Sequence, residues 1–300
     1  MSSATAEVES PSPGRLARSV AHVAAFFRTF PGAAVGAFLL VVFVGLALSS
    51  GAVHELAYQN HPAERLQPPA WQEGGSSAHL LGTDALGRDV AARIMVAIRI
   101  SMTVAAVAVL VAGAIGIVVG IVAGYVGRWI DDVLMRSTDA MLAVPLVLFA
   151  IMVMTVLEPG IRSLILVIAV TQWMTYARVA RAETLALKEQ QYVTAARAIG
   201  ARDLRILGRH ILPQLLPSAI ALLTLNVSVV VLLEAGLSFL GLGVQLPDPS
   251  LGSLLSEGRQ YIFRATWLAI YPGVALLLLV LGINLLGDGL RAYLDPHSRR

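Results

Sequence analysis

The stretch SMTVAAVAVLVAGAIGIVVGIVAG at residues 101–124 contains no charged side chain. A helix of about 20 apolar residues, rising about 1.5 Å per residue, crosses the roughly 30 Å hydrocarbon core of a bilayer, so this stretch predicts a transmembrane helix. Gly116, Gly120 and Gly124 recur within it at four-residue spacing, with Gly113 just before them. Such glycines share one helix face and let a neighbouring backbone approach closely. We expect a helix of the same chain there, and a contact between subunits is the alternative.

Five further apolar stretches extend this pattern in both directions along the chain, at residues 32–48, 138–157, 163–178, 213–234 and 267–287. The shortest, 163–178, is bounded by Arg162 and Arg178, whose long side chains can reach the membrane interfaces. The 300 residues are 57% hydrophobic and 14% charged, whereas soluble domains average roughly 45–50% apolar and about 25% charged residues. The sequence therefore predicts an all-α membrane protein with six transmembrane helices.

The distribution of basic residues predicts the orientation in the membrane. Of the 22 Lys and Arg residues, 15 fall in segments on the side of the N-terminus and 7 on the opposite side. Because basic residues favour the cytoplasmic side, we expect both termini in the cytoplasm, residues 52–98 as an outer loop and residues 183–212 as a cytoplasmic loop. Residues 1–14 are polar and rich in Pro and Ser. We expect residues 1–30 to form a cytoplasmic tail and residues 31–300 the transmembrane domain.

The first apolar stretch has a competing interpretation as a cleaved signal peptide. Arg15, Arg18 and Arg28 precede it, an arrangement that signal peptides share. The stretch begins late, is about as long as a span and lacks a clean cleavage motif after it. These features favour an uncleaved first span.

The sequence contains none of the motifs that would identify an enzyme or an energy-coupling site. Cys is absent, which excludes disulfides, thiolate catalysis and Cys-based metal sites. Lys188 is the only lysine and stands between Leu187 and Glu189, so no P-loop for ATP is present. The six histidines lack the H-E-x-x-H spacing of a helical metal site, no G-x-S-x-G motif occurs, and the arginines form no basic patch for nucleic acid. We predict no catalytic residue, no metal site and no cofactor in this chain.

Three polar residues lie within or at the end of the last two apolar stretches: Asn226, Glu234 and Asn284. A polar group in hydrocarbon needs a partner, and hydrogen bonds between membrane helices contribute only ~0.6–2 kcal/mol each. We expect these residues to pack between helices or to line a pathway, with packing favoured for the two asparagines. A buried acid can also couple an ion gradient to transport, so a self-contained secondary transporter or channel is the main alternative.

The sequence of the cytoplasmic loop predicts a pair of short helices. Residues 189–200, EQQYVTAARAIG, form a helical pattern with Gly200 as its C-terminal stop. In the helical stretch 201–210 that follows, arginines at positions 202, 205 and 209 share one face, and Pro213 opens the fifth span. Small side chains flanked by arginines suit a groove on another protein. A solvated amphipathic surface is the alternative.

The sequence TAARAIG at residues 194–200, followed by Leu212 and Pro213, resembles the EAA loop of binding-protein-dependent ABC importer permeases. The family pattern is E-A-A, three residues, G, nine residues and I-x-L-P. Thr194 departs from it where the family often has Glu, which removes a possible salt bridge to an ATPase. His210 departs where the pattern has Ile, but the resulting His-Ile-Leu-Pro is itself similar to the peptide-importer branch.

Three further motifs resemble the C-type subunit of dipeptide and oligopeptide importers. LGTDALGRD at residues 81–89, with Arg93 after it, is similar to the outer-loop signature of that subunit. The candidate site residues of this signature are Gly82, Thr83, Asp84, Gly87, Arg88 and Asp89. LSFLGLG at residues 237–243, and NLLGDGLR at residues 284–291 with LDP at residues 294–296, are similar to its later signatures. The glycines of the outer loops serve either turns or docking.

This resemblance implies the type I ABC importer permease fold in a bacterial inner or plasma membrane. Besides the lipid bilayer, it implies three partners: a B-type permease that shares the translocation pathway, ATP-binding subunits that hold ATP and Mg²⁺, and an extracytoplasmic substrate-binding protein. The outer loops 52–98 and 236–266 would meet the binding protein or the partner permease. The implied ATPase-coupling residues are Tyr192, Thr194, Ala195, Ala196, Arg197, Gly200, Leu212 and Pro213. Dipeptides or oligopeptides are the implied cargo, with nickel, glutathione or haem as alternatives within the same importer class.

Overall fold

The computed structural model describes residues 26–294, whose regular structure is helical apart from one isolated bridge between Thr83 and Asp89. The elements are α2 (Pro31–Ser49), α3 (His54–Tyr58), η1 (Pro62–Glu64), α4 (Val90–Val126), α5 (Arg128–Leu142), α6 (Leu146–Met154), α7 (Ile161–Lys188), α8 (Gln191–Ala198), α9 (Asp203–Ile206), η2 (Leu207–Ile211), α10 (Leu212–Phe239), α11 (Leu251–Arg259) and α12 (Trp267–Leu294). Most of the tail expected at residues 1–30 lies outside the described residues, as do both chain ends and residues 295 and 296 of the last motif.

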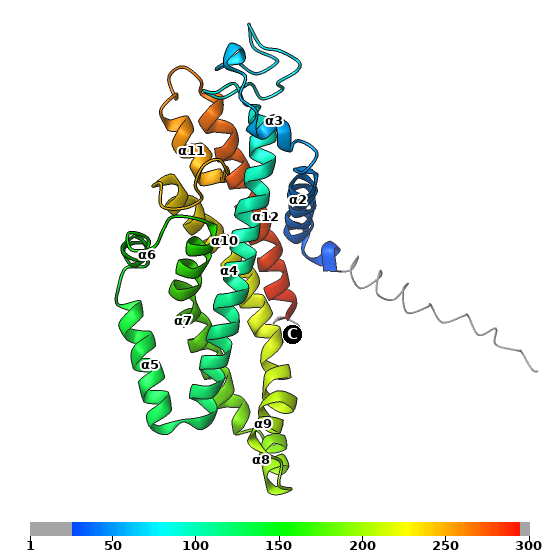
Figure 1. The fold of residues 1–300 in the computed structure, drawn as a ribbon. Coiled ribbons are helices and arrows are strands. Elements are labelled where there is room, and N and C mark those ends of the chain that lie inside the picture. Colours follow the sequence, from blue (N-terminus) through cyan, green and yellow to red (C-terminus); the bar gives the residue numbers. More distant parts are fainter. Residues whose placement is uncertain (1–25, 295–300) are drawn as a thin grey trace, which may run out of the picture.

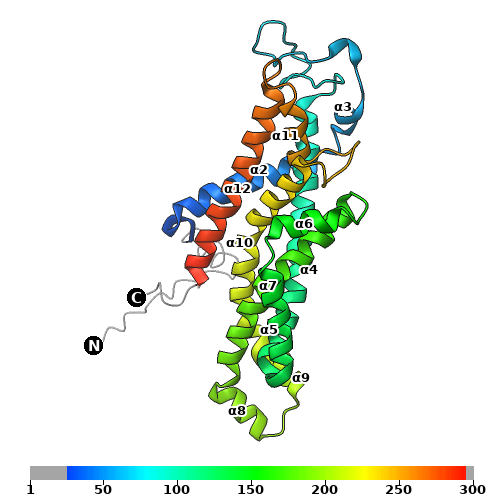
Figure 2. The ribbon, with the colours of Figure 1, turned by 90° about the vertical axis from the view of Figure 1, so that its left-hand side faces the viewer.

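Five helical segments of the described chain are long and apolar enough to cross a membrane: α2, α4, α7, the continuous segment from α9 through α10, and α12. They correspond to five of the six predicted spans. The bundle is elongated, with α8 and α9 at one tip and α11 near the other (Figures 1 and 2). We call residues 183–211 the α8 end. Residues 50–89 and 240–266 lie at the opposite end and are called the loop end.

The third predicted span, residues 138–157, is not one straight helix. Its residues are divided between the end of α5 and α6, and these two helices meet at an angle of 87°. The break falls at Pro145, which has no backbone N–H to donate and disfavours helical geometry in the residue before it. The pair counts as a sixth span only as a bent unit, so the prediction of one continuous third helix is wrong.

The glycine face of α4 packs against α7 of the same chain, as expected. A side-chain carbon added to Gly116 would collide with the backbone oxygen of Trp173. One turn further, a carbon added to Gly120 would collide with the oxygen of Ala177. Only glycine therefore permits the observed distance between the two helices.

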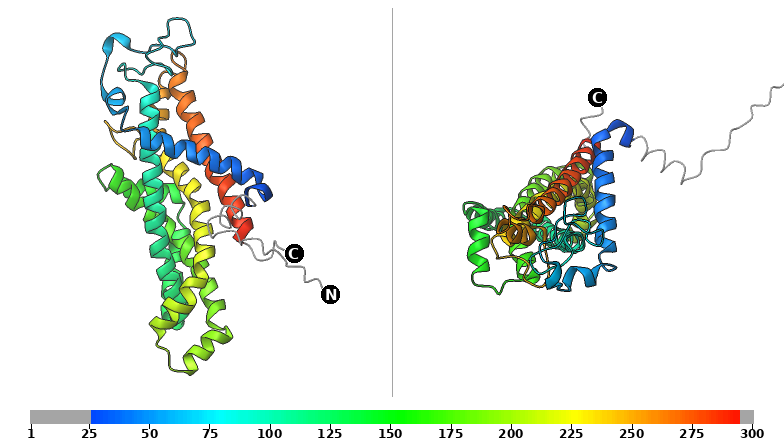
Figure 3. Two further views of the ribbon diagram at one scale, coloured as in Figure 1. Left: turned by 90° about the vertical axis from the view of Figure 1, so that its right-hand side faces the viewer. Right: turned by 90° about the horizontal axis from the view of Figure 1, so that it is seen from above.

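The first span, α2, lies across α12 rather than parallel to it (Figure 3). At the crossing, a side-chain carbon added to Gly36 would lie 2.6 Å from the amide nitrogen of Leu286 and 2.7 Å from the oxygen of Gly282. The main hydrophobic core lies between the spans and includes Phe43 of α2, Val104 of α4 and Leu164 of α7. A separate small cluster that contains Val193 and Ile206 lies at the α8 end.

Candidate functional site

The short helix of the α8 end forms where the sequence predicted it. α8 covers Gln191–Ala198, inside the expected range 189–200, and the chain turns at Gly200 with a φ of +83°. This left-handed conformation is the one that glycine adopts after a helix C-terminus without a steric penalty. The second expected stretch, 201–210, is instead α9 followed by the π-helical turn η2, which continues directly into α10. Pro213 lies in the first turn of α10, as predicted.

One face of α8 is buried inside the chain itself. Val193 and Ala196 pack against Ile206 and Ile211 in a small hydrophobic cluster, and Ala196 is only 7% exposed. Ala196 was expected, with Ala195, to be available for close docking on a partner. The methyl group of Ala196 packs against α9 and η2 within this chain and is not part of the exposed surface. Leu212 is likewise partly buried, against a neighbouring cluster.

The opposite face of this helix pair is open. Thr194, Ala195 and Arg197 are exposed, as is Tyr192 in part. The sequence analysis did not single out the side chains with the largest exposed apolar surface here: Ile199 is 86% exposed and Leu204 is 84% exposed. Large apolar side chains left in the open outside membrane spans mark interaction surfaces in folded proteins. We call Tyr192, Ala195, Ile199 and Leu204 the open face.

Three contacts attach the α8 end to the end of α4. The Tyr125 hydroxyl donates a hydrogen bond of 2.6 Å to Asp203, and the Arg197 guanidinium lies 5.9 Å from the centre of the Tyr125 ring. The Lys188 ammonium donates to the Gly124 carbonyl oxygen at 2.9 Å. Of these residues only Arg197 was a candidate from the sequence. The others are 60 or more residues apart from their partners along the chain, so no local pattern joins them.

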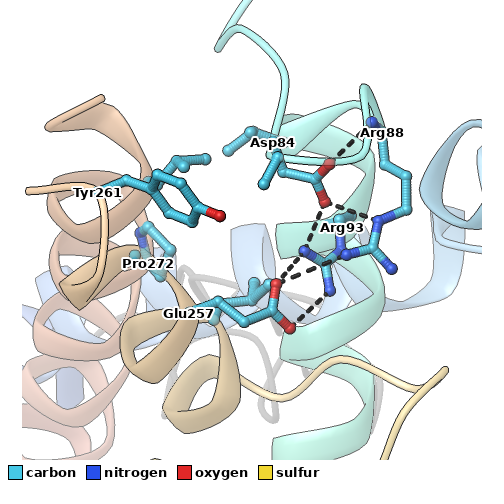
Figure 4. A pocket seen from close by; sticks show the side chains of 11 residues that line it. Asp84, Arg88, Arg93, Glu257, Tyr261 and Pro272 are labelled. Atoms are coloured by element: carbon cyan, nitrogen blue, oxygen red, sulfur yellow. Dashed lines mark hydrogen bonds and ion pairs between the residues drawn. The ribbon is translucent and has the colours of Figure 1, made fainter. Parts of the chain in front are cut away.

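At the loop end, the signature LGTDALGRD folds into a buried network of charges (Figure 4). The Asp84 carboxylate accepts hydrogen bonds from Nε of Arg88 at 2.7 Å and from the Arg93 guanidinium at 2.8 Å. Arg93 also donates to both carboxylate oxygens of Glu257 on α11, at 2.6 and 3.1 Å. Asp84, Arg88 and Arg93 are buried, and Arg93 is only 2% exposed. The cluster therefore joins the start of α4 to α11, two elements far apart in the sequence.

The remaining signature residues complete the same structure. Asp89 caps α4 by accepting from the amide of Ala92 at 2.7 Å, and the carbonyl oxygen of Thr83 accepts from the Trp267 indole at 3.2 Å. Gly82 and Gly87 both have positive φ values, of +79° and +78°. A side-chain carbon on Gly87 would also collide with the carbonyl of His61, so the glycines of this loop serve its turns and its close packing.

A buried histidine links this network to η1. His79 lies with Nδ1 2.9 Å from an Asp89 oxygen and Nε2 3.2 Å from a Glu64 oxygen. Burial alone would lower the pKa of His79, but the hydrogen bonds and negative charges of the two carboxylates raise it above its ordinary value. The two acids therefore favour the protonated form of the ring. Neither His79 and its partner Glu64, nor Glu257 of the neighbouring charge network, stood out in the sequence.

The three polar residues of the last spans lie in different surroundings. Glu234 of α10 is fully buried, and one carboxylate oxygen accepts from Ser238 at 2.7 Å while the other has no hydrogen-bond partner among the described residues. Asn226 lies beside Tyr176 of α7, and in the described chain its amide nitrogen is unpartnered. Asn284 is half-buried on α12. The structure does not bring these residues together into one site.

A groove of about 760 Å³ lies near the α8 end, between α7 and α10. Its lining is mostly apolar, with Glu183, Gln214, Ser218 and Arg291 as the polar members. Ser218 donates to Glu183 across the groove at 2.5 Å. Within residues 26–294, no group of three or more His, Asp or Glu side chains is placed to hold a metal ion.

Comparison with known proteins gives one family. Residues 116–300 match the family described as binding-protein-dependent transport system inner membrane component. The dipeptide transport system permease protein DppC of Haemophilus influenzae is 40% identical over 277 residues, 92% of this chain and 94% of that protein. DppC of Escherichia coli (strain K12) is 41% identical over 280 residues, 92% of each chain. The glutathione transport system permease protein GsiD of Pectobacterium atrosepticum is 39% identical over 274 residues, 90% of this chain and 88% of that protein.

A solved structure has a similar fold. The inward-facing MetNI methionine ABC transporter contains a chain that superimposes with a TM-score of 0.52 at 20% sequence identity. The match covers 65% of this chain and 93% of that chain. At this level of identity the similarity concerns the arrangement of helices, and it agrees with the type I ABC importer permease fold that the motifs implied.

Proposed function

Because this chain belongs to the family of binding-protein-dependent transport system inner membrane components, we propose that it is the C-type permease subunit of an ABC importer for dipeptides or oligopeptides. Its relatives are permease subunits, and those named for dipeptides match it over nine-tenths of its length. A relative named for glutathione matches it almost as well, so glutathione is the alternative cargo that a specific observation supports.

One observation carries the proposal of a separate ATPase. The open face exposes Ile199 and Leu204 almost completely, where α8 ends and where the segment from α9 through α10 begins, at one tip of the bundle (Figure 1). The sequence has no P-loop, so the chain needs another subunit to supply energy. We assign the open face to contact with that ATP-binding subunit, which would hold ATP and Mg²⁺. Arg197 lies beside this face, and Ala196 supports it from behind.

The loop end has the opposite role in this proposal. It would face the outside of a bacterial inner membrane, where a substrate-binding protein delivers cargo and a B-type permease completes the pathway. The buried charge network around Asp84 would keep the outer mouth in shape, because its charged groups pair with one another within the chain. This orientation rests on the distribution of basic residues, with 15 on the proposed cytoplasmic side and 7 on the other.

Two single cysteine variants test the orientation, since the chain contains no Cys of its own. Ser77 is exposed at the loop end and Ala198 is exposed at the α8 end. We expect Ser77→Cys to react with an impermeant thiol reagent added to intact cells, and Ala198→Cys to react only after the membrane is permeabilised. Labelling of both variants in intact cells would contradict the proposed orientation.

Reconstitution tests the function itself. Vesicles that contain this chain, the B-type permease and the ATP-binding subunits should take up a labelled dipeptide when ATP and the binding protein are supplied. Omitting any one component should abolish uptake. Uptake by this chain alone, driven by an ion gradient, would establish a secondary transporter instead. Competition between the dipeptide and glutathione for uptake would identify the preferred cargo.

A further inference from the structure

A second pocket, of about 330 Å³, lies at the loop end next to α3 and α4. Its polar lining comprises His54 and Tyr58 of α3, Arg99 and Thr103 of α4, and Asp248 of the loop between α10 and α11. None of these residues belongs to the charge network around Asp84. The family signatures described above do not include them either.

The depth of this pocket in the bundle is defined by the ends of three spans. Ser50, in its lining, directly follows α2, and Ile161 is the first residue of α7. Arg99 directly precedes the apolar part of α4 that begins near residue 101. The upper part of α4 runs past α3 at this level (Figure 1). The pocket therefore lies where the hydrocarbon core of a bilayer meets the headgroup region.

Below the pocket, the same face of α4 becomes apolar and stays open. Arg99 and Thr103 are exposed, and residues at the following four-residue intervals are Val107 and Val111. Both valines are exposed, as is Leu110 between them. An exposed apolar stripe thus leads from a charged group at the membrane boundary into the membrane.

The charges around the pocket are of both signs. Arg99 forms no ion pair with any acidic side chain of the described chain, and a guanidinium binds phosphate through two parallel hydrogen bonds. Asp248 accepts a hydrogen bond of 2.7 Å from the Tyr58 hydroxyl, which occupies one of its two carboxylate oxygens. The rings of His54 and Tyr58 stack with centroids 4.4 Å apart beside it. A carboxylate next to aromatic rings suits a cationic amine.

Burial and the Asp248 carboxylate raise the pKa of Tyr58 to about 12. Its hydroxyl therefore keeps its proton and remains a donor to Asp248 over the physiological pH range. Arg99 and the Tyr58–Asp248 pair line the same pocket. This places a phosphate-binding cation and an amine-binding anion on one small cavity.

We propose that this pocket binds the headgroup of a phospholipid that carries a phosphate and a primary amine, such as phosphatidylethanolamine. The phosphate would contact Arg99, the ammonium would lie between Asp248 and the ring pair, and an acyl chain would follow the stripe of Val107 and Val111. A zwitterionic peptide offers the same two charges. It has no counterpart for the apolar stripe, so the geometry favours the lipid.

Lipid retention by the purified assembled transporter tests this proposal without depending on transport. The complex is delipidated and then mixed with phosphatidylethanolamine, phosphatidylcholine or phosphatidylglycerol, and bound lipid is counted by native mass spectrometry. We expect phosphatidylethanolamine to be retained best. The trimethylated amine of phosphatidylcholine cannot donate to Asp248, and phosphatidylglycerol has no amine. Arg99→Gln and Asp248→Asn should each reduce retention about tenfold, the effect of one charge-assisted hydrogen bond.

Arg264→Gln is the matched control, because Arg264 is another exposed arginine of the loop end outside this pocket. It should retain phosphatidylethanolamine like the parent protein. Arg99 is exposed and forms no ion pair within the described residues. Arg99→Gln should therefore leave the thermal unfolding midpoint unchanged. A loss of bound lipid in this variant then reports a loss of binding. Equal retention of the three lipids, or wild-type retention in both pocket variants, would overturn the proposal. Saturable binding of a dipeptide that is lost in Arg99→Gln would make the pocket a cargo site and would also overturn it.

Discussion

At the loop end, charged side chains are buried and paired with one another, whereas at the α8 end large apolar side chains stand in the open. Asp84, Arg88 and Arg93 are joined by hydrogen bonds to one another and to Glu257, and among the buried side-chain nitrogens and oxygens of this network only Nε of Arg93 lacks a partner within the described residues. Ile199 and Leu204 have no such cover within the described residues. The first arrangement is complete within one chain, and the second becomes complete only with a partner. The charge network should therefore respond to substitution through folding and the open face through assembly.

Breaking the charge network should produce the largest effect. Arg93→Ala would remove one of the two arginines that pair with Asp84 and Glu257, and removing one member of a buried ion pair costs about 3–5 kcal/mol. We expect a large fall in the thermal unfolding midpoint of the purified subunit and little assembled transporter. Arg264→Ala removes an exposed arginine from the same end and should change neither value. Equal midpoints for the two variants would show that the network does not stabilise this end.

Substitutions at two neighbouring alanines distinguish an effect on folding from an effect on assembly at the α8 end. Ala195→Glu places a charge on the open face, so the subunit should fold normally but co-purify with at least tenfold less ATP-binding subunit. Ala196→Glu forces a carboxylate among Val193, Ile206 and Ile211, where an unpaired charge costs several kcal/mol. It should detach α8 and expose this segment to protease. If Ala195→Glu co-purified with the ATP-binding subunit as well as the wild-type chain does, the open face would not be the ATPase contact.

The turn after α8 should give a smaller effect. Gly200→Ala places a side chain in a left-handed conformation, which costs roughly 1–2 kcal/mol, although no atom lies within 4 Å to obstruct it. We expect uptake to fall by about tenfold or less while the spans insert normally. Gly208→Ala is the matched control, because Gly208 is also unobstructed but lies in the helical turn η2. Similar losses in both variants would mean that the turn geometry at Gly200 is unimportant.

The smallest effect concerns pH and is confined to the loop end. The pKa of His79 is raised in the folded chain, so the protonated ring stabilises the fold fully below its unfolded pKa of about 6.5. That contribution is lost as the pH rises through the folded pKa. The unfolding midpoint should therefore fall more between pH 6 and pH 8 in the parent protein than in His79→Gln. Identical pH profiles would show that the Asp89 and Glu64 contacts do not bind the protonated ring.

Much of the fold follows from the length of the apolar stretches alone. A run such as residues 101–124 has no charge to hydrate, so only a helix across the membrane satisfies its backbone and its side chains together. The stretch 138–157 has the same hydropathy, yet it contains Pro145, and the bend at this proline separates α5 from α6. Hydropathy is averaged over a window of residues, so it does not report that one backbone N–H is missing at a proline. The proline itself was the available signal.

The site was less predictable, because its contacts join distant parts of the chain. Asp84 and Arg88 could be selected from one motif, but Arg93 and Glu257 are 164 residues apart and no local pattern pairs them. Ala195 and Ala196 are equally small, so the sequence could not decide which one faces Ile206. Ile199 and Leu204 looked like ordinary apolar positions of a helix pair. Their exposure depends on how α8 folds back against η2, which only the three-dimensional structure defines.

One helix touches both ends. α4 has 37 residues and, at about 1.5 Å per residue, is roughly 55 Å long without a break. Arg93, in its first turn, is clamped to α11, and Tyr125, in its last turn, is bonded to Asp203 of α9. Its glycines pack closely on α7 along the third of the helix that adjoins the α8 end. A displacement imposed on α8 would therefore act on α4 where it is held against α7, and α4 reaches from there to the loop end without a break.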